Sequence, residues 1–493
     1  MPCSSDRWPR PTVTLSRNVS TPPERNTYGH STRLMNLQTL RRLIQRGDID
    51  TVIVAFPDVT GRLVGKRFVG KIFLDSVAEH GTHGCNYLLT VNIEMEPQSG
   101  FRLANWESGF GDFKLQPDME TLRLVPWLPG TALVICDFCR GDGQPVGEAP
   151  RSVLRRQLEW LAKQRLVCRV ASELEFFLFN DSYHDAFAAD YRGLIPSSDY
   201  RIDYHTMQPA RDEGLFRALR NQMAAARVPV ESSKGEWGRG QHEVNFIHTT
   251  PIEMADLHTV FKQGVKEIAA QHGRSVTFMA KPSMTEPGSS CHIHTSLWPE
   301  RRRPARRVSA DAQNLFWDAK KSCGSKLFRQ FLGGLLKYSR ELCYFFGPTV
   351  NAYKRYQPGS WAPTKLAWAH DNRTVGFRVV GQGNSFRIEN RMPGADANPY
   401  LAFAATLAAG LAGVEEGLDC GECHEGNAYI DAQLPALPGS LRDAADLLDK
   451  SKLARRAFGE DVVDFYVHTA RLEVQAFGNT VTDWEMKRYF ERI

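Results

Sequence analysis

Polar and apolar residues alternate with a period of two in four short segments of the chain, at positions 171–179, 240–246, 289–298 and 385–394. Because successive side chains of a β-strand point to opposite faces of a sheet, each segment predicts a strand with one polar and one apolar face. The polar faces omit Lys and Thr, which are common on faces exposed to water, and concentrate Glu, His and Arg. Their members are Glu173 and Glu175; Gln241, Glu243 and Asn245; His292, His294 and Ser296; and Arg387, Glu389 and Arg391.

Two interpretations of this alternation are open at this point. A single half-solvated sheet would show the same period without binding anything. A convergent polar site would bring together groups that hold metals and phosphates, and the choice of Glu, His and Arg favours it. Hard divalent cations such as Mg²⁺ and Mn²⁺ prefer carboxylate oxygens, and Mn²⁺ also accepts an imidazole. The candidate ligands are Glu173, Glu175, Glu236, Glu243, His292 and Glu389.

The charge of this set indicates two metal ions. Its five carboxylates would repel one another in a metal-free folded cluster, whereas two divalent cations nearly neutralise them. Two ions bridged to phosphate imply phosphoryl transfer, and arginines in the second half of the chain supply further positive charge. These arginines are Arg355, Arg373, Arg378, Arg387 and Arg391.

The sequence contains no phosphate-binding loop of a familiar type. The nearest match, GRLVGKR at positions 61–67, is one residue shorter than the P-loop pattern and lacks the Ser or Thr that would hold Mg²⁺. Kinase and dinucleotide-binding fingerprints are also absent. If ATP binds, we therefore expect it to do so in a funnel lined by metal ions and arginines.

The chain divides into three predicted parts. Positions 1–34, rich in Pro, Ser, Thr and Arg, predict a disordered basic tail. Positions 35–145 predict a small β-rich domain with strands at 51–56 and 62–69, and a Gly/Pro-rich linker leads to a larger domain at 146–493. Long helices are expected in the larger domain at 151–165, 253–272, 326–345 and 398–416.

Composition excludes several classes of protein. The net charge of +5 comes from the tail and from an Arg-rich segment at 299–310, which leaves the rest slightly acidic and argues against a nucleic-acid partner. The apolar run at 400–414 is shorter than the ~20 residues that span a bilayer and predicts a buried helix. Ten scattered cysteines without an apolar signal segment indicate free thiols in a reducing cytoplasm. The Cys-x-x-Cys spacings at 136–139 and 420–423 are accordingly read as neither haem attachment nor a shared zinc site.

From about Leu37 to the C-terminus, the chain resembles the type I glutamine synthetase family. The resemblance implies an α+β fold, with a small β-grasp N-terminal domain and a catalytic domain whose curved antiparallel sheet forms a funnel flanked by helices. It also implies a homo-dodecamer of two hexameric rings, with each active site between neighbouring subunits. The matching stretches are ASELEFF, ESSKGEWGRGQHEVNF, FMAKPSMTEPGSSCHIHTSLW, NAYKRYQPGSWAPTKLAW, DNRTVGFRVV and RIENRMPGADANPYL.

The resemblance further implies an ATP-dependent carbon–nitrogen ligase of nitrogen metabolism. In such enzymes the γ-phosphate of ATP passes to the side chain of glutamate, and an amine or ammonium attacks the resulting γ-glutamyl phosphate. Family motifs place Glu175, Glu236 and Glu243 on the ion nearer the amino acid. They place Glu173, His292 and Glu389 on the ion that holds the nucleotide phosphates. The same motifs imply Arg373 and Arg378 for transferring phosphate, Arg355 and Arg391 for glutamate and developing charge, Ser296 and Arg387 for nucleotide, Gly288 and His294 for the glutamate pocket and reacting groups, and Asp58 for the incoming nitrogen.

Three departures from the family pattern bear on the substrate. Trp361 occupies the position of a flap glutamate that accepts the ammonium proton, and Pro287 replaces an asparagine that contacts glutamate. The tyrosine-bearing loop that is adenylylated in some bacterial enzymes has no clear counterpart near residues 419–430. An indole cannot act as a base, but it can pack against an alkyl chain or an ammonium group.

We therefore predict a γ-glutamyl amide ligase that uses an amine, of the branch that takes ethanolamine or polyamines. The segments GRLVGKRF, HGTHGCNYLLTVNIEMEP and NRMPGADANPYLAF look closer to that branch than to ammonium-using enzymes. A true glutamine synthetase is the alternative. A non-catalytic structural relative is disfavoured, because all six metal-ligand positions hold competent residues.

Overall fold

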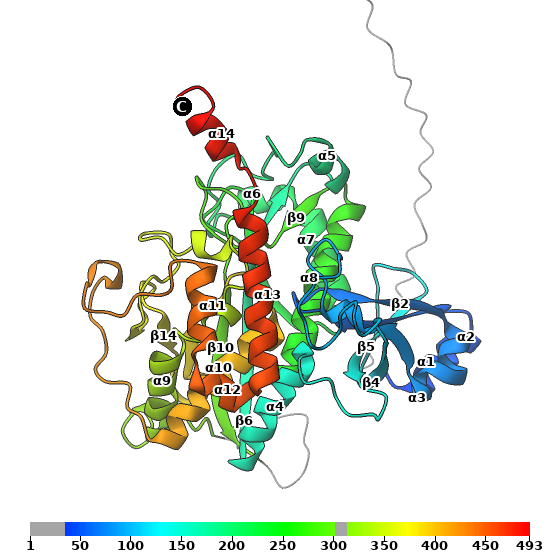
Figure 1. The fold of residues 1–493 in the computed structure, drawn as a ribbon, viewed down its shortest axis with the longest axis horizontal. Helices are drawn as coiled ribbons and strands as arrows, with labels where there is room; N and C mark the ends of the chain where they lie inside the picture. The colour runs from blue at the N-terminus through cyan, green and yellow to red at the C-terminus, as the bar shows by residue number, and fades with distance from the viewer. Residues whose placement is uncertain (1–34, 301–312) are drawn as a thin grey trace, which may run out of the picture. The chain divides into compact units, whose positions relative to one another are not determined.

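The computed structural model describes residues 35–300 and 313–493 (Figure 1). The predicted tail and most of the Arg-rich segment lie outside the described residues. Residues Asn36–Ile493 form one compact unit. The proposed division of this unit at residue 145 stays a prediction.

An eight-stranded sheet forms the centre of the larger part. Its order is β13-β14-β15-β10-β6-β8-β7, with β9 paired to β6, and all its pairs are antiparallel except β13 with β14. All four segments with alternating polar residues form strands of this sheet. The strands are β6 (Leu166–Phe179), β7 (Val230–Gly235), β8 (Gln241–Phe246), β9 (Ser275–Thr277), β10 (Cys291–Pro299), β13 (Trp368–His370), β14 (Phe377–Val380) and β15 (Arg387–Asn390).

A five-stranded sheet lies in the N-terminal part, in the order β2-β1-β5-β4-β3. Its β1 and β5 run parallel, and the other pairs are antiparallel. The predicted strands at 51–56 and 62–69 are confirmed. The strands are β1 (Thr51–Pro57), β2 (Leu63–Val69), β3 (Thr82–Cys85), β4 (Asp112–Leu124) and β5 (Thr131–Cys139); a further short pair is formed by β11 (Trp317–Asp318) and β12 (Cys323–Gly324).

Helices pack on the larger sheet, with α4 and α8 against β6 (Figure 1). The helix α10 contacts α4, α8 and α9, and it is buried from Pro399 to Gly413, as its apolar sequence predicts. Close approach to α9 requires glycine, because a Cβ on Gly334 would lie 2.1 Å from the Ala409 carbonyl oxygen. The longer helices are α1 (Leu37–Gln45), α4 (Pro150–Lys163), α7 (Glu213–Ala225), α8 (Pro251–Gln271), α9 (Lys326–Tyr338), α10 (Pro399–Glu416), α11 (Leu441–Asp449) and α13 (Glu460–Gly478). The shorter ones are α2 (Gly70–Ile72), α3 (Ala78–His80), α5 (Tyr183–Ala188), α6 (Met207–Arg211), α12 (Lys452–Phe458) and α14 (Asp483–Tyr489).

One helix is shorter than its sequence predicts. The apolar pattern at 326–345 indicates a continuous helix, but α9 ends at Tyr338 and a separate 3₁₀ turn covers Cys343–Phe345. The residues of that turn are buried. They are apolar because they lie in the core, and not because the helix continues through them. None of the helices in the described part combines the length and apolar character that a bilayer span requires.

A buried ionic cluster joins the small sheet to two helices of the larger part. Arg151 at the start of α4 is 2% exposed and pairs with Asp118 of β4 at 2.8 Å, Asp137 of β5 at 2.9 Å and Asp256 of α8 at 3.0 Å. The hydroxyl of Tyr400 also donates to Asp256 at 2.6 Å. Since an unpaired charge is costly in the interior, this cluster favours one arrangement of β4, β5, α4 and α8.

Candidate functional site

Strand register brings the four polar faces onto one surface of the larger sheet. Glu173 of β6 lies opposite His292 of β10, and Glu175 of β6 lies opposite Glu243 of β8. On the other side of β10, His294 lies opposite Glu389 of β15. Since Glu389 is fully buried and Glu243 is only 5% exposed, the alternative of a half-solvated sheet is wrong.

The first group of three possible metal ligands is Glu173, His292 and Glu389, which each offer an atom within 4.8 Å of the others. His292 Nδ1 lies 2.8 Å from Glu173 and 3.4 Å from Glu389, and Arg378 and Arg391 pair with Glu389. Burial alone would raise the pKa of Glu389, but the Arg391 guanidinium and His292 lower it to about 2. This group is called the nucleotide-side triad after the role that the family resemblance implies; Glu389 is ionised, and two arginines balance its charge.

The second group is Glu175, Glu236 and Glu243, which also meet within 4.8 Å. Here the cation is Lys234, which pairs with Glu236 and approaches Glu243 at 4.0 Å. Burial and the Glu236 carboxylate raise the pKa of Glu175 to about 8, while burial and the Glu173 and Glu236 carboxylates raise that of Glu243 to about 10. This group is called the amino-acid-side triad after the role that the family resemblance implies. It sets three carboxyls against one lysine, so mutual repulsion favours the protonated forms of Glu175 and Glu243.

Both triads have the donors that a hard divalent cation requires. Five carboxylates and one imidazole converge, and His292 Nε2 is buried without a hydrogen-bond partner. A cation would accept that nitrogen lone pair and remove the repulsion that raises the pKa of Glu175 and Glu243. The residues present therefore fit the divalent metals that the sequence predicts.

We expect the stability of the metal-free protein to fall as pH rises from about 4.5 to about 10. The raised pKa values of Glu175 and Glu243 favour folding fully below their ordinary value of 4.5, and this contribution is lost as pH rises through about 8 and then 10. The measurement is Tm against pH in the presence of a chelator.

Glu243→Gln should flatten this slope, and added Mn²⁺ should reverse most of it by binding the ionised carboxylates. A slope that is the same in Glu243→Gln and in the unmodified protein would contradict the assignment.

The five predicted arginines occupy different environments. Arg378 and Arg391 contact the nucleotide-side triad directly, whereas Arg387 donates to His294 Nδ1 at 3.1 Å. Arg373 is exposed on the loop before β14. Arg355 is fully buried and donates to the Met392 and Arg391 carbonyls and to Ser290 Oγ, which uses three of its donors within the protein.

Three further predicted residues lie beside the triads. His294 Nε2 is 3.3 Å from Glu173, and the Ser296 hydroxyl accepts from Trp298 Nε1 at 2.9 Å. Gly288 accepts a hydrogen bond from Gln241 through its carbonyl, and a Cβ there would lie 2.5 Å from the Ala280 carbonyl oxygen. The backbone at Gly288 is thus held too closely for any side chain.

Asp58 is not brought to either triad within this chain. It follows β1 in a tight turn and is 1% exposed, and it accepts from the Thr60 backbone and hydroxyl and from Arg62 Nε at 2.7 Å. The Asp58 carbonyl also accepts from Asn398 at the start of α10. Its predicted role across a subunit boundary therefore stays a prediction.

Trp361 lies beside the triads, in contact with a residue that the sequence analysis missed. Arg391 donates to the Trp361 carbonyl at 3.4 Å, and the Trp361 ring meets the Trp237 ring at a centroid distance of 5.7 Å. Trp237 directly follows the candidate ligand Glu236, so its position in the sequence could have identified it as a residue of the site. Lys234, also missed, lies two positions before Glu236 on the same strand-and-turn segment.

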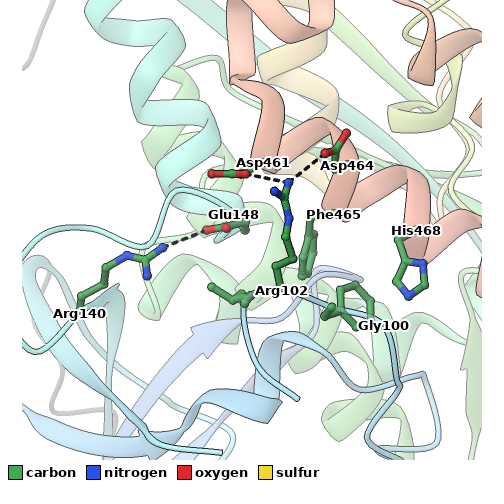
Figure 2. Close-up of a pocket in the computed structure, with 10 residues that line it drawn as sticks. Gly100, Arg102, Arg140, Glu148, Asp461, Asp464, Phe465 and His468 are labelled. Atoms are coloured by element: carbon green, nitrogen blue, oxygen red, sulfur yellow. Dashed lines mark hydrogen bonds and ion pairs between the residues drawn. The ribbon is translucent and has the colours of Figure 1, made fainter. Parts of the chain in front are cut away.

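A separate cavity of about 300 Å³ lies between residues 100–103 and α13 (Figure 2). Arg102 bridges Asp461 and Asp464 there, and Arg140 approaches Glu148 at 3.8 Å (Figure 2). Its described charged groups pair largely with one another, and no member of either triad lines it. This cavity is not the candidate active site.

Comparisons with known proteins point to one family. The family model described as "Glutamine synthetase, catalytic domain" matches residues 147–489. The chain is 49% identical to a gamma-glutamylethanolamide synthetase of Streptomyces coelicolor, covering 93% of this chain and 96% of that protein. It is 35% identical to a glutamate–isopropylamine ligase of Pseudomonas, covering 92% and 98%. A solved structure described as a GmaS/ADP complex aligns with a TM-score of 0.78 at 26% identity, covering 92% and 99%.

Proposed function

Because this chain belongs to the glutamine synthetase family, we propose that it joins glutamate to a short primary amine at the site formed by the two triads. The chain is an ATP-dependent ligase that forms a γ-glutamyl amide, as its similarity to two glutamate–amine ligases supports. The alternative of a true glutamine synthetase is less supported, since the relatives described above at 49% and 35% identity are amine ligases.

The reaction proceeds in two balanced steps. The γ-phosphoryl group of ATP moves to a side-chain oxygen of glutamate, which releases ADP and leaves an acyl phosphate. The amine nitrogen then attacks the acyl carbon, the bond to the phosphate oxygen breaks, and the nitrogen loses a proton as inorganic phosphate leaves. Divalent cations in the two triads would neutralise the phosphate and carboxylate charges that otherwise repel one another.

The protein's own residues have separate tasks in this proposal. Arg378 pairs with Glu389, and Arg373 lies on the exposed loop before β14. Both arginines stabilise the charge on the moving phosphoryl group. Arg391 orients Glu389 and, with the buried Arg355, favours a substrate carboxylate nearby. Ser296 and Arg387 contact the nucleotide, and Gly288 and His294 line the glutamate side. Mg²⁺ or Mn²⁺, two per site, is the proposed metal.

The finer features of the architecture are also proposals. The mixed five-stranded sheet, with parallel β1 and β5 at its centre, is compatible with the β-grasp domain expected at 35–145. We propose that the larger domain at 146–493 forms the funnel and that twelve copies assemble as two hexameric rings. The small domain of one subunit would then complete the site of its neighbour.

The presence of Trp361 beside the triads is the main observation that favours an amine over ammonium as the substrate. The family resemblance implies a proton acceptor at this position in ammonium-using enzymes, and Trp361 is 47% exposed beside the triads. An uncharged aromatic face there provides contact area for an alkyl chain and cannot accept a proton.

We expect ammonium to be a poor substrate compared with ethanolamine or isopropylamine. The measurement is ADP release with ATP and glutamate against a panel of amines and ammonium. Trp361→Glu should shift the ratio of kcat/KM values toward ammonium by about 10-fold or more, because it supplies a general base. Trp361→Gln is the control, because glutamine has nearly the size of glutamate but cannot act as a base. Efficient glutamine formation by the unmodified protein, with every amine ignored, would favour the glutamine synthetase alternative.

Asp58→Ala is expected to raise the KM for the amine while the affinity for ATP stays within about 2-fold. The reason is that the proposed role of Asp58 lies in binding and deprotonating the incoming nitrogen of a neighbouring subunit. Asp58→Asn keeps an oxygen that accepts the Thr60 hydrogen bonds of the turn, so it separates loss of the turn from loss of the carboxylate.

Mixed rings provide the sharper test of a shared site. Combining Asp58→Ala subunits with Glu236→Ala subunits should restore part of the activity, since some interfaces then hold an intact turn and an intact triad. Verified mixed rings without restored activity would show that Asp58 is only a turn residue.

A further inference from the structure

Two tryptophans from distant segments form an aromatic corner at the amino-acid-side triad. The Trp361 and Trp237 rings meet at 64° with centroids 5.7 Å apart, in an edge-to-face arrangement. The backbone N–H of Trp237 donates to Glu236 at 3.1 Å, and the backbone carbonyl of Trp361 accepts from Arg391. The backbone of each tryptophan is therefore held by a residue of the proposed catalytic machinery, and the two rings meet beside it.

The backbone of Trp361 adds an independent sign that this ring is held in place for a purpose. Its φ is +66°, in the left-handed region where a bulky side chain is rarely found. Such a conformation persists only where the surroundings impose it, and it occurs disproportionately at functional sites. Although large and apolar, this side chain remains 47% exposed.

A cation already covers one face of the corner. The Arg201 guanidinium lies 4.5 Å from the centre of the Trp237 ring, and the described part of the chain gives Arg201 no carboxylate partner. Lys234, three positions before Trp237, is held by Glu236 and, at 3.5 Å, by Asp203. The aromatic face that would otherwise attract an ammonium group is thus occupied by the protein's own positive charge.

We propose that Trp237, Trp361 and Arg201 form a selectivity wall for the amine. The two indole rings accept a short alkyl or hydroxyalkyl chain, and Arg201 repels a substrate that carries a second positive charge. The wall therefore favours monoamines over diamines and polyamines. This inference rests on the amine ligation proposed above and deepens it by naming the charge class of the amine.

The test compares kcat/KM for ethanolamine and putrescine, measured by ADP release, in the full-length protein and in Arg201→Gln. Removing the positive charge of Arg201, which would repel the second ammonium of putrescine, should raise the putrescine-to-ethanolamine ratio about 5- to 10-fold. Arg211→Gln is the matched control, because this exposed arginine of α6 pairs with Asp199 and carries no described contact with Trp237. It should leave the ratio unchanged.

A second variant tests the apolar half of the wall. Trp237→Leu should raise the KM for isopropylamine several-fold more than the KM for ammonium, and Trp237→Phe should restore part of the difference. Two results would overturn the selectivity wall while leaving the proposed function intact. In the first, Arg201→Gln uses ethanolamine normally and its putrescine-to-ethanolamine ratio is unchanged. In the second, Arg201→Gln and Arg211→Gln shift that ratio equally. An unmodified protein that uses ammonium and no amine would overturn both the wall and the proposed function.

Discussion

Glu173→Gln should lower ATP-dependent amide formation by ~10²- to 10³-fold or more while the protein stays folded. The carboxylate lies 2.8 Å from His292 Nδ1 and 3.3 Å from His294 Nε2, so the amide keeps the shape but loses the charge that holds a cation. Turnover is measured by ADP release, and Mn²⁺ affinity by calorimetry. Both should fall together.

Glu389→Gln should lower turnover by a similar factor, but it also leaves Arg378 and Arg391 without their carboxylate partner. Glu173→Gln is therefore the cleaner variant, and Glu231→Gln, on the exposed part of β7, is the control. Near-full turnover in both site variants would remove the metal assignment. If Glu173→Gln loses turnover but keeps its Mn²⁺ affinity, Glu173 is not a metal ligand and contributes to the reaction in another way.

Arg151→Met should lower the free energy of unfolding by about 3 to 5 kcal/mol. This change leaves Asp256, whose side chain is 4% exposed, without its cationic partner in the interior. The measurement is the midpoint of urea unfolding at a fixed protein concentration, because assembly would itself contribute to the stability.

Arg155→Met is the matched control for this cluster. Arg155 pairs with the same Asp118 and Asp137 carboxylates, but its side chain is 41% exposed, so its loss should cost no more than about 1 kcal/mol. If both variants lose the same free energy of unfolding, the burial of Arg151 does not make its ion pairs more important than those of Arg155. Replacing Arg151 and Asp256 together with Met and Leu should recover part of the loss, since no buried charge on α8 then lacks its partner.

Side-chain alternation made the candidate site accessible to sequence analysis. Glu173 and Glu175 must share a face once their segment is a strand, and the same rule applies to His292 and His294. Alternation therefore pointed to five of the six candidate ligands. Glu236 lies before the segment at 240–246, and the division into two sets came from the family resemblance; the structure brings the members of each set within 4.8 Å of one another. By contrast, the end of α9 at Tyr338 was missed, because residues beyond it are buried in a 3₁₀ turn and continue the apolar pattern.

The sequence by itself determined that the four alternating segments are strands, which residues share their polar faces, and that the run at 400–414 is a buried helix. Each of these follows from local side-chain directions or local apolar content. Only the tertiary structure decided which faces meet. The register of β6 with β10 and β8 pairs Glu173 with His292 and Glu175 with Glu243, and no local pattern contains that information. Contacts such as Trp237 with Trp361 depend on loops more than a hundred positions apart, so they exist only once the sheet has assembled.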